Sequence, residues 1–187
     1  MLPVLRAARQ HADLPVVTLA ALLSFGNKTS EGRLVEAVAI PWFRIISLIR
    51  EDPQYIYEIN PFDWEQIIAG AYKAAGFDEV ILTPRSGDKG RDVIATMRGL
   101  GSVTIIDQVK AYRPGHRVRA DDVRAIVGVL HMEKNVSKAF ITTTSEFAPM
   151  VREDALIKSL ISEQLELRPR DVLLPWLEEI ATKSLER

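Results

Sequence analysis

The chain has no cysteine among its 187 residues, which excludes several kinds of site at once. Without a thiol there can be no disulfide scaffold, thiolate-bound metal, iron–sulfur cluster or cysteine nucleophile. Histidine is also scarce, with three residues, and neither His11 nor His131 has a partner at the spacing of a zinc site. Several classes of enzyme are thereby removed.

Long apolar runs are missing as well. The longest one near the start, Leu14 to Phe25, has about half the length of a membrane-spanning helix. Arg9 and Asp13 precede it, and no basic segment leads directly into it as in a signal peptide. We therefore expect a cytoplasmic protein with no membrane partner. A content of 47% hydrophobic and 26% charged residues is typical of one globular domain with a modest extension.

A strong charge of one sign is absent, since the formal net charge is -1. Bulk charge therefore does not predict a nucleic-acid partner. The distribution is uneven, however: residues 85–124 hold nine Lys and Arg against five Asp, an excess of four positive charges, and the remainder carries -5. A nucleic-acid surface and a solvated rim that happens to be basic explain this segment equally well.

Residues 1–52 are predicted to form an N-terminal helical extension. Leu14 to Phe25 is predicted as one short apolar element, 26–32 as a loop, and 34–50 as helix with a break at Pro41. The apolar stripe after that break comprises Trp42, Ile45, Ile46 and Ile49. Nothing in this extension carries recognisable chemistry.

Residues 53–187 are predicted to form the main domain, with its core over about 61–160. Asn60 can cap a helix that begins with Pro61 and ends at Gly76. Strands follow at 79–83, 92–97 and 103–110, then a helix over 121–131 and, after a connection that suits a βαβ-like crossover, a strand over 138–144. A helix over 147–160, a strand over 164–168 and a helix over 169–185 complete the chain.

Four polar residues form the informative constellation: Glu65 on the first core helix, Asp92 at the start of one strand, and Gln108 and Lys110 at the end of its neighbour. Residues two apart on a strand share a face, and antiparallel pairing could bring Asp92 beside Gln108. Carboxylate and amide oxygens suit Mg²⁺, and a nearby lysine can position water or offset charge on a phosphate. Singly, Lys110 could be a solvated lysine and Asp92 a turn residue; their joint occurrence favours a site.

The segment from Phe62 to about Ala155 resembles the catalytic domain of Mrr-like restriction endonucleases, which belong to the PD-(D/E)xK nuclease superfamily. The likeness rests on the helix sequence at 62–68 with its end at 75–77, on the segment 86–94 with its Gly-Asp-Lys-Gly turn, on Gln108-Val109-Lys110, and on 141–148. It covers about half of the chain and leaves out the N-terminal extension and the last thirty or so residues.

The resemblance implies an α/β fold with an αβββαβ core, in which helices flank a mixed central sheet. It also implies hydrolysis of DNA that depends on Mg²⁺, with Mn²⁺ as a substitute, in the restriction of foreign or modified DNA. The products would carry 5′-phosphate and 3′-hydroxyl ends.

The resemblance also implies roles for individual residues. Asp92 would be the main metal ligand, joined by Gln108 and the backbone carbonyl of Val109, and Lys110 would be the catalytic lysine. Glu65 would support the metal or the lysine. Gln in the acidic position is usual in this branch, but a neutral ligand attracts Mg²⁺ less than a carboxylate, so Glu65 should matter more here. Arg91 stands where the superfamily's name places a proline, a loosely kept position.

Basic residues flank this constellation on two segments, and we expect them to contact DNA phosphates. They are Arg85, Lys89 and Arg91 around the turn, and Arg113, His116, Arg117 and Arg119 in the loop after Lys110. A mobile charged loop without a ligand is the ordinary alternative for the second group. The turn lacks the Gly-Lys-Ser/Thr ending of a phosphate loop and does not open a helix, so we expect no nucleotide cofactor.

Three functions stay open at this point. The first is a Mg²⁺-dependent endonuclease acting on double-stranded DNA, which we expect to be a homodimer because one site per chain cuts one strand. The second is a catalytically inactive nuclease-fold module that binds DNA without cutting it, for want of a second strand acid. The third is an interaction protein whose N-terminal helices dock a partner, which would show no salt-dependent affinity for DNA.

Overall fold

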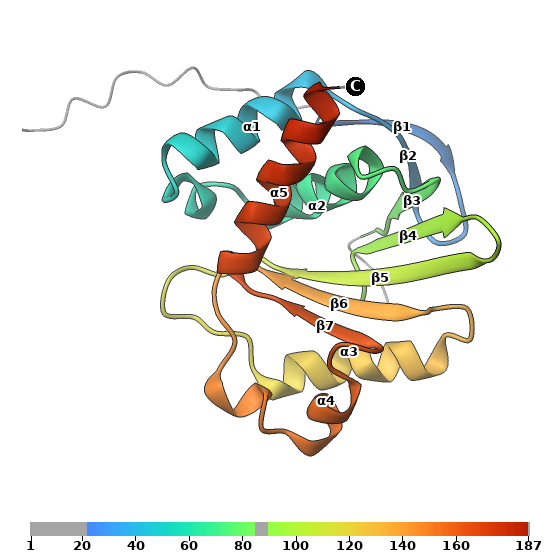
Figure 1. Ribbon diagram of the computed structural model, residues 1–187, viewed down its shortest axis with the longest axis vertical. Helices are drawn as coiled ribbons and strands as arrows, with labels where there is room; N and C mark the ends of the chain where they lie inside the picture. Colours follow the sequence, from blue (N-terminus) through green and yellow to red (C-terminus); the bar gives the residue numbers. More distant parts are fainter. Residues whose placement is uncertain (1–21, 85–89, 187) are drawn as a thin grey trace, which may run out of the picture.

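A seven-stranded mixed sheet crosses the molecule, and its strands follow one another in chain order (Figure 1). The computed structural model describes residues 22–84 and 90–186. The strands are β1 (Leu23–Lys28), β2 (Arg33–Val38), β3 (Glu79–Leu82), β4 (Val93–Arg98), β5 (Ser102–Lys110), β6 (Lys138–Thr143) and β7 (Leu165–Arg168). Neighbours from β1 to β5 are antiparallel, whereas β5, β6 and β7 are parallel. The predicted α/β fold with a mixed sheet is confirmed.

One face of the sheet is covered by α1 (Ile40–Glu51), α2 (Pro61–Ala74) and α5 (Arg170–Leu185) (Figure 1). The predicted start of α2 is confirmed, since the Asn60 side chain accepts a hydrogen bond from the Asp63 N–H at 3.0 Å. The indole N–H of Trp42 in α1 donates to the Ile67 carbonyl of α2 at 2.9 Å. Both aromatic and aliphatic side chains of these helices pack on β3, β4 and β5 in one apolar core.

The opposite face is covered by α3 (Ala120–Met132) and α4 (Ala155–Leu160) (Figure 1). The predicted stripe of α3 is buried here: Val123, Ile126, Val127 and Leu130. They pack against Ile106 and Ile141 in a second core. The element order from α2 to β6 is thus helix, three strands, helix, strand, as the resemblance implies. Among the described residues no helix is long and apolar enough to cross a bilayer.

The prediction of a helical N-terminal extension is wrong for residues 23–38. Strands β1 and β2 form a hairpin there, and β2 adds to the main sheet through the pairs Arg33–Leu82 and Leu34–Ile81. Thr29 closes the turn, because its hydroxyl accepts the Gly32 N–H at 3.1 Å. The Glu and Ala of β2 and the Gly and Asn of β1 are poor strand formers, so pairing with β3 overrides local preference. Part of the predicted first element, residues 14–21, lies outside the described residues.

The helix after Pro41 is confirmed as α1, with the predicted stripe Trp42, Ile45, Ile46 and Ile49 buried. Pro41 lies in its first turn, where a missing N–H costs nothing. The single helix predicted over 147–160 is instead a 3₁₀ turn, Pro149–Val151, followed by α4. Asp154 follows that turn and caps α4 by accepting the N–H groups of Leu156 and Ile157, each at 3.1 Å.

Candidate active site

Asp92 immediately precedes β4 and is held in place by β5. Its backbone N–H donates to the Asp107 carbonyl at 2.9 Å, and its carboxylate accepts the Val109 N–H at 2.7 Å. The paired register of β4 and β5 ends at Val93–Asp107, so these two contacts hold Asp92 against β5 just beyond the ladder. The Asp92 carboxylate therefore lies against the backbone of the residue that separates Gln108 from Lys110.

Gln108 shares its face of β5 with Ile106, on the side covered by α3. Its amide oxygen is buried and has no hydrogen-bond partner among the described residues. A buried acceptor without a donor is costly, and such atoms are concentrated where a ligand or ion completes the site. The orphaned Gln108 oxygen therefore fits a bound cation, and the Asp92 carboxylate is hydrogen-bonded to the N–H of the next residue, Val109.

Lys110 ends β5 on the same face as Gln108, as predicted. Its ammonium lies 3.8 Å from the carboxylate of Asp122 in the first turn of α3. Both side chains are about three-quarters buried. Asp122 also accepts the Arg119 N–H at 3.0 Å, so it connects the start of α3 to the lysine. No sequence pattern indicated Asp122 as a site residue, because its meeting with Lys110 depends on the path of the intervening loop.

Glu65 lies one turn into α2, on the helix that covers the other face of the sheet, and is partly buried. The start of that helix, Asn60 and Pro61, shares a cavity with Ala111 and Arg113, which follow β5. The start of α2 thus lies at the same end of the sheet as Lys110, whereas Glu65 belongs to the layer opposite the face that carries Gln108 and Lys110. Within residues 22–84 and 90–186, no three His, Asp or Glu side chains gather as a metal cluster. A cation here would depend on an amide and a carbonyl oxygen besides carboxylates.

The predicted DNA-contacting residues divide into three groups. Arg85 and Lys89 lie outside the described residues. Arg91 is only 3% exposed and pairs with Glu31 and Glu133, so the structure does not bring it to the surface. The remaining four are all exposed after β5: Arg113, His116, Arg117 and Arg119.

The loop that carries these four exposed residues is tied down at several points. His116 stacks on Tyr112 with ring centroids 4.1 Å apart, and its carbonyl accepts the Ser145 hydroxyl at 2.7 Å. Val118 exchanges backbone hydrogen bonds with Glu146 and Ala148, at 2.9 and 2.8 Å. The loop is thus anchored to the segment after β6, with its basic side chains directed away from the cores.

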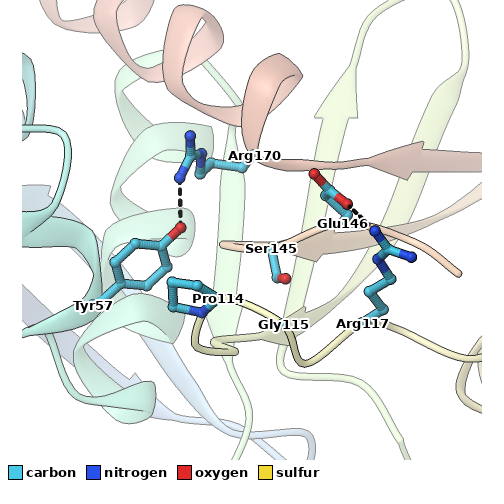
Figure 2. A pocket seen from close by; sticks show the side chains of 7 residues that line it. All are labelled: Tyr57, Pro114, Gly115, Arg117, Ser145, Glu146 and Arg170. Atoms are coloured by element: carbon cyan, nitrogen blue, oxygen red, sulfur yellow. Dashed lines mark hydrogen bonds and ion pairs between the residues drawn. The ribbon is translucent and has the colours of Figure 1, made fainter.

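A cavity of about 420 Å³ opens beside this loop (Figure 2). Tyr57 and Arg170 line one side of it, and Arg117 and Glu146 line the other, with Ser145 between them. The structure adds Tyr57 and Arg170 to the residues near the site. Their side chains are hydrogen-bonded although 113 positions separate them, so no local pattern could have indicated the pair.

A buried polar cluster lies behind the site, on the other face of β5. The Asp107 carboxylate accepts hydrogen bonds from Tyr72 at 2.7 Å and Thr142 at 2.8 Å, and Arg168 lies 3.4 Å away. The Arg168 guanidinium stacks on Trp176, 3.9 Å from the ring centroid. Burial raises the pKa of Asp107 to about 6, although Arg168 and the two hydroxyl donors act in the opposite direction. The Asp107 carbonyl also accepts the Asp92 N–H, so this cluster stabilises the position of Asp92.

Two solved structures share this fold. The MspJI restriction endonuclease in complex with a 27-mer oligonucleotide matches with a TM-score of 0.50 at 14% identity, over 76% of this chain and 36% of that one. The DNA modification-dependent restriction endonuclease AspBHI matches with a TM-score of 0.50 at 18% identity, over 80% of this chain and 39% of that one. The architecture is therefore a restriction endonuclease fold, and the chain spans less than half the length of either of these proteins.

The restriction endonuclease family represented by the Mrr catalytic domain matches residues 56–177. This range is well over half of the chain, so the chain belongs to that family, and the resemblance drawn from its motifs is confirmed. The matched range contains Glu65, Asp92, Gln108 and Lys110. No curated protein matches the chain.

Proposed function

We propose that the protein is a divalent-metal-dependent endonuclease that hydrolyses phosphodiester bonds of DNA, in the restriction of foreign or modified DNA. The observation that carries the proposal is the hydrogen bond between the Asp92 carboxylate and the N–H of Val109, the residue between Gln108 and Lys110, which share one face of β5. It occurs where the ladder between the inner strands β4 and β5 ends, in a restriction endonuclease fold. A strand carboxylate, an orphaned amide oxygen and a lysine together suit phosphoryl chemistry.

The donor set fits Mg²⁺, with Mn²⁺ as a substitute. Asp92, the Gln108 amide oxygen and the Val109 carbonyl would hold the ion from two neighbouring strands, and Glu65 would add a carboxylate from α2. All are oxygen donors of the kind that hard cations prefer. Bound there, the ion would stabilise negative charge on the phosphate and on the leaving oxygen.

Lys110 supplies the remaining catalytic group. Its ammonium orients the attacking water by hydrogen bonding and offsets the charge that develops on the phosphate. Asp122 limits the freedom of this long side chain, because it holds an ion pair with the lysine at 3.8 Å. The exposed basic residues that follow β5 would bind the DNA backbone and align the phosphate with the site.

Metal removal is the direct test of this proposal. The protein is expected to nick or linearise supercoiled plasmid with Mg²⁺ or Mn²⁺, and to lose this activity completely in EDTA. Methylated and unmethylated plasmids are compared in parallel, to show whether modification guides cutting. Cleavage that persists in EDTA would contradict the metal mechanism, and DNA binding without cleavage under every condition would leave only the binding module.

Gln108→Glu is expected to strengthen Mg²⁺ binding about tenfold, because a carboxylate replaces a neutral ligand. Isothermal titration calorimetry measures the affinity, and Gln164→Glu, at an exposed position before β7, is the matched control for added charge. An unchanged affinity in Gln108→Glu would show that the amide oxygen is not a ligand.

We further propose that two copies act together on double-stranded DNA. One site per chain cuts one strand, so a symmetric dimer is the simplest way to cut both. Sedimentation velocity with a cleavable duplex in Ca²⁺ is expected to show two protein chains per duplex. A complex with one chain that still produces double-strand breaks would refute this arrangement.

A further inference from the structure

The cavity in Figure 2 lies at the edge of the sheet where the parallel strands end. Ser145 and Glu146 follow β6, Arg170 follows β7, and Arg117 lies in the loop after β5. Lys110 is in register with Thr143, so the cavity begins two residues beyond the level of the lysine. In sheets with parallel strands, ligands bind outside these carboxyl ends.

The two arginines of the cavity differ in their partners. Arg117 forms an ion pair with Glu146 at 3.2 Å, which neutralises its charge. Arg170 donates a hydrogen bond to the Tyr57 hydroxyl, and its guanidinium lies 6.0 Å from the centroid of the same ring. No carboxylate pairs with Arg170 in the part of the chain that the structure describes. The cavity therefore has one positive charge without a counter-charge.

Tyr57 holds Arg170 through only one of the N–H donors of the guanidinium. A guanidinium carries five N–H donors in a fixed fork, and the single hydroxyl accepts from one of them. The other donors remain for an anion, and the fork geometry matches two oxygens of a phosphate. The Tyr57 ring limits the rotation of the arginine, so less side-chain entropy is lost when an anion binds.

We propose that this cavity, the Arg170 cavity, binds a DNA backbone phosphate that flanks the scissile one, with Arg170 as the binding group and Tyr57 as its positioning residue. The proposal rests on the proposed function, because DNA must lie along this edge of the sheet. A DNA phosphate is favoured over a free anion because the cavity borders both the exposed basic loop and the edge that carries Lys110. The contact would fix the register of the strand relative to the site.

The test is DNA affinity as a function of salt, measured by fluorescence anisotropy with a labelled duplex in Ca²⁺, for the full chain. Arg170→Gln is expected to weaken binding about tenfold and to reduce the slope of log K against log[salt] by about one, the value for one lost phosphate contact. Arg170→Lys keeps the charge and should keep the slope, while Tyr57→Phe keeps the ring and should weaken binding less than Arg170→Gln does.

Arg98→Gln is the matched control. Arg98 pairs with Glu79 as Arg117 pairs with Glu146, but it lies at the turn between β4 and β5, at the opposite end of β5 from Lys110. The DNA affinity and the salt slope of Arg98→Gln should equal those of the unmodified protein. Equal melting temperatures of the variants establish that each one folds.

Duplexes with one neutral methylphosphonate locate the contact. At one flanking position the modification should weaken binding of the unmodified protein and have no effect on Arg170→Gln. An unchanged salt slope in Arg170→Gln would overturn the proposal while leaving the nuclease intact. Failure of the unmodified protein to bind any duplex would instead remove the proposed function itself, and this proposal with it.

Discussion

Asp92→Ala is expected to lower plasmid cleavage on the order of a thousandfold or more, because it removes the carboxylate that we propose as the main cation ligand. The change also removes the acceptor of the Val109 N–H, which lies at 2.7 Å in the folded protein. Cleavage rates are measured with Mg²⁺ at saturating protein, and binding is measured separately in Ca²⁺. DNA affinity should change little, since the proposed phosphate contacts come from other residues.

Two further variants distinguish the loss of the Asp92 charge from the loss of a structural hydrogen bond. Asp92→Asn keeps an oxygen that can accept from Val109 but loses the charge, so it should be nearly as inactive as Asp92→Ala. Asp78→Ala is the control, because the Asp78 carboxylate also accepts a backbone N–H of the sheet, that of Arg98 at 2.6 Å, far from the site. Full activity in Asp92→Asn, or equal losses in Asp78→Ala and Asp92→Ala, would disprove the role assigned to Asp92.

Arg168→Met is expected to lower the free energy of unfolding at pH 8 by about 3–5 kcal/mol, the cost of leaving a buried charge without its partner. Asp107 is fully buried, and Arg168 is the cation next to it at 3.4 Å. Met keeps much of the packing between Trp176 and Phe140. Urea denaturation followed by circular dichroism gives the difference. Arg98→Met, at an exposed ion pair, should cost less than about 1 kcal/mol.

The same cluster makes stability depend on pH. Burial raises the pKa of Asp107 from 3.8 to about 6, so the folded protein holds this proton more tightly than the unfolded chain does. The stabilising contribution of the protonated form is complete below about pH 4 and is lost as the pH rises through 6, in total about 3 kcal/mol. Asp107→Asn should remove this decline, and Arg168→Met should cost less at pH 5 than at pH 8. Parallel pH profiles for Asp107→Asn and the unmodified protein would show that Asp107 does not titrate in this range.

The strand residues of the candidate site could be predicted because their placement depends on short-range rules. Gln108 and Lys110 share a face wherever residues 108–110 are extended, and antiparallel pairing of adjacent strands brings the start of β4, next to Asp92, to the end of β5. These relations do not depend on how the helices pack. The core elements were likewise indicated by strong periodicity, as in α3 with its four buried apolar residues.

Features that depend on contacts between residues far apart in the sequence could not be predicted from local patterns. Arg33 and Leu34 form a strand because β3 is beside them, and nothing in their own segment distinguishes this from a helix. Asp107 could be assigned to the face opposite Gln108, but its contact with Arg168 could not be predicted, because Arg168 is 61 residues away in the sequence. Arg170 and Tyr57 meet only after β7 and the segment before α2 have been placed.

The register between β4 and β5 also determines which changes of chain length the protein can tolerate. The turn at Gly99–Gly101 lies at the far end of both strands, and its two glycines face open space, so extra residues could be added there without moving Asp92 relative to Gln108. A deletion of one residue within β5 would exchange its two faces, turning the Gln108 side chain from the face covered by α3 to the face covered by α2. Within β4, β5 and their connection, natural insertions and deletions should therefore occur in that turn and be absent from residues 102–110. A set of related sequences would reveal this pattern without any measurement of activity.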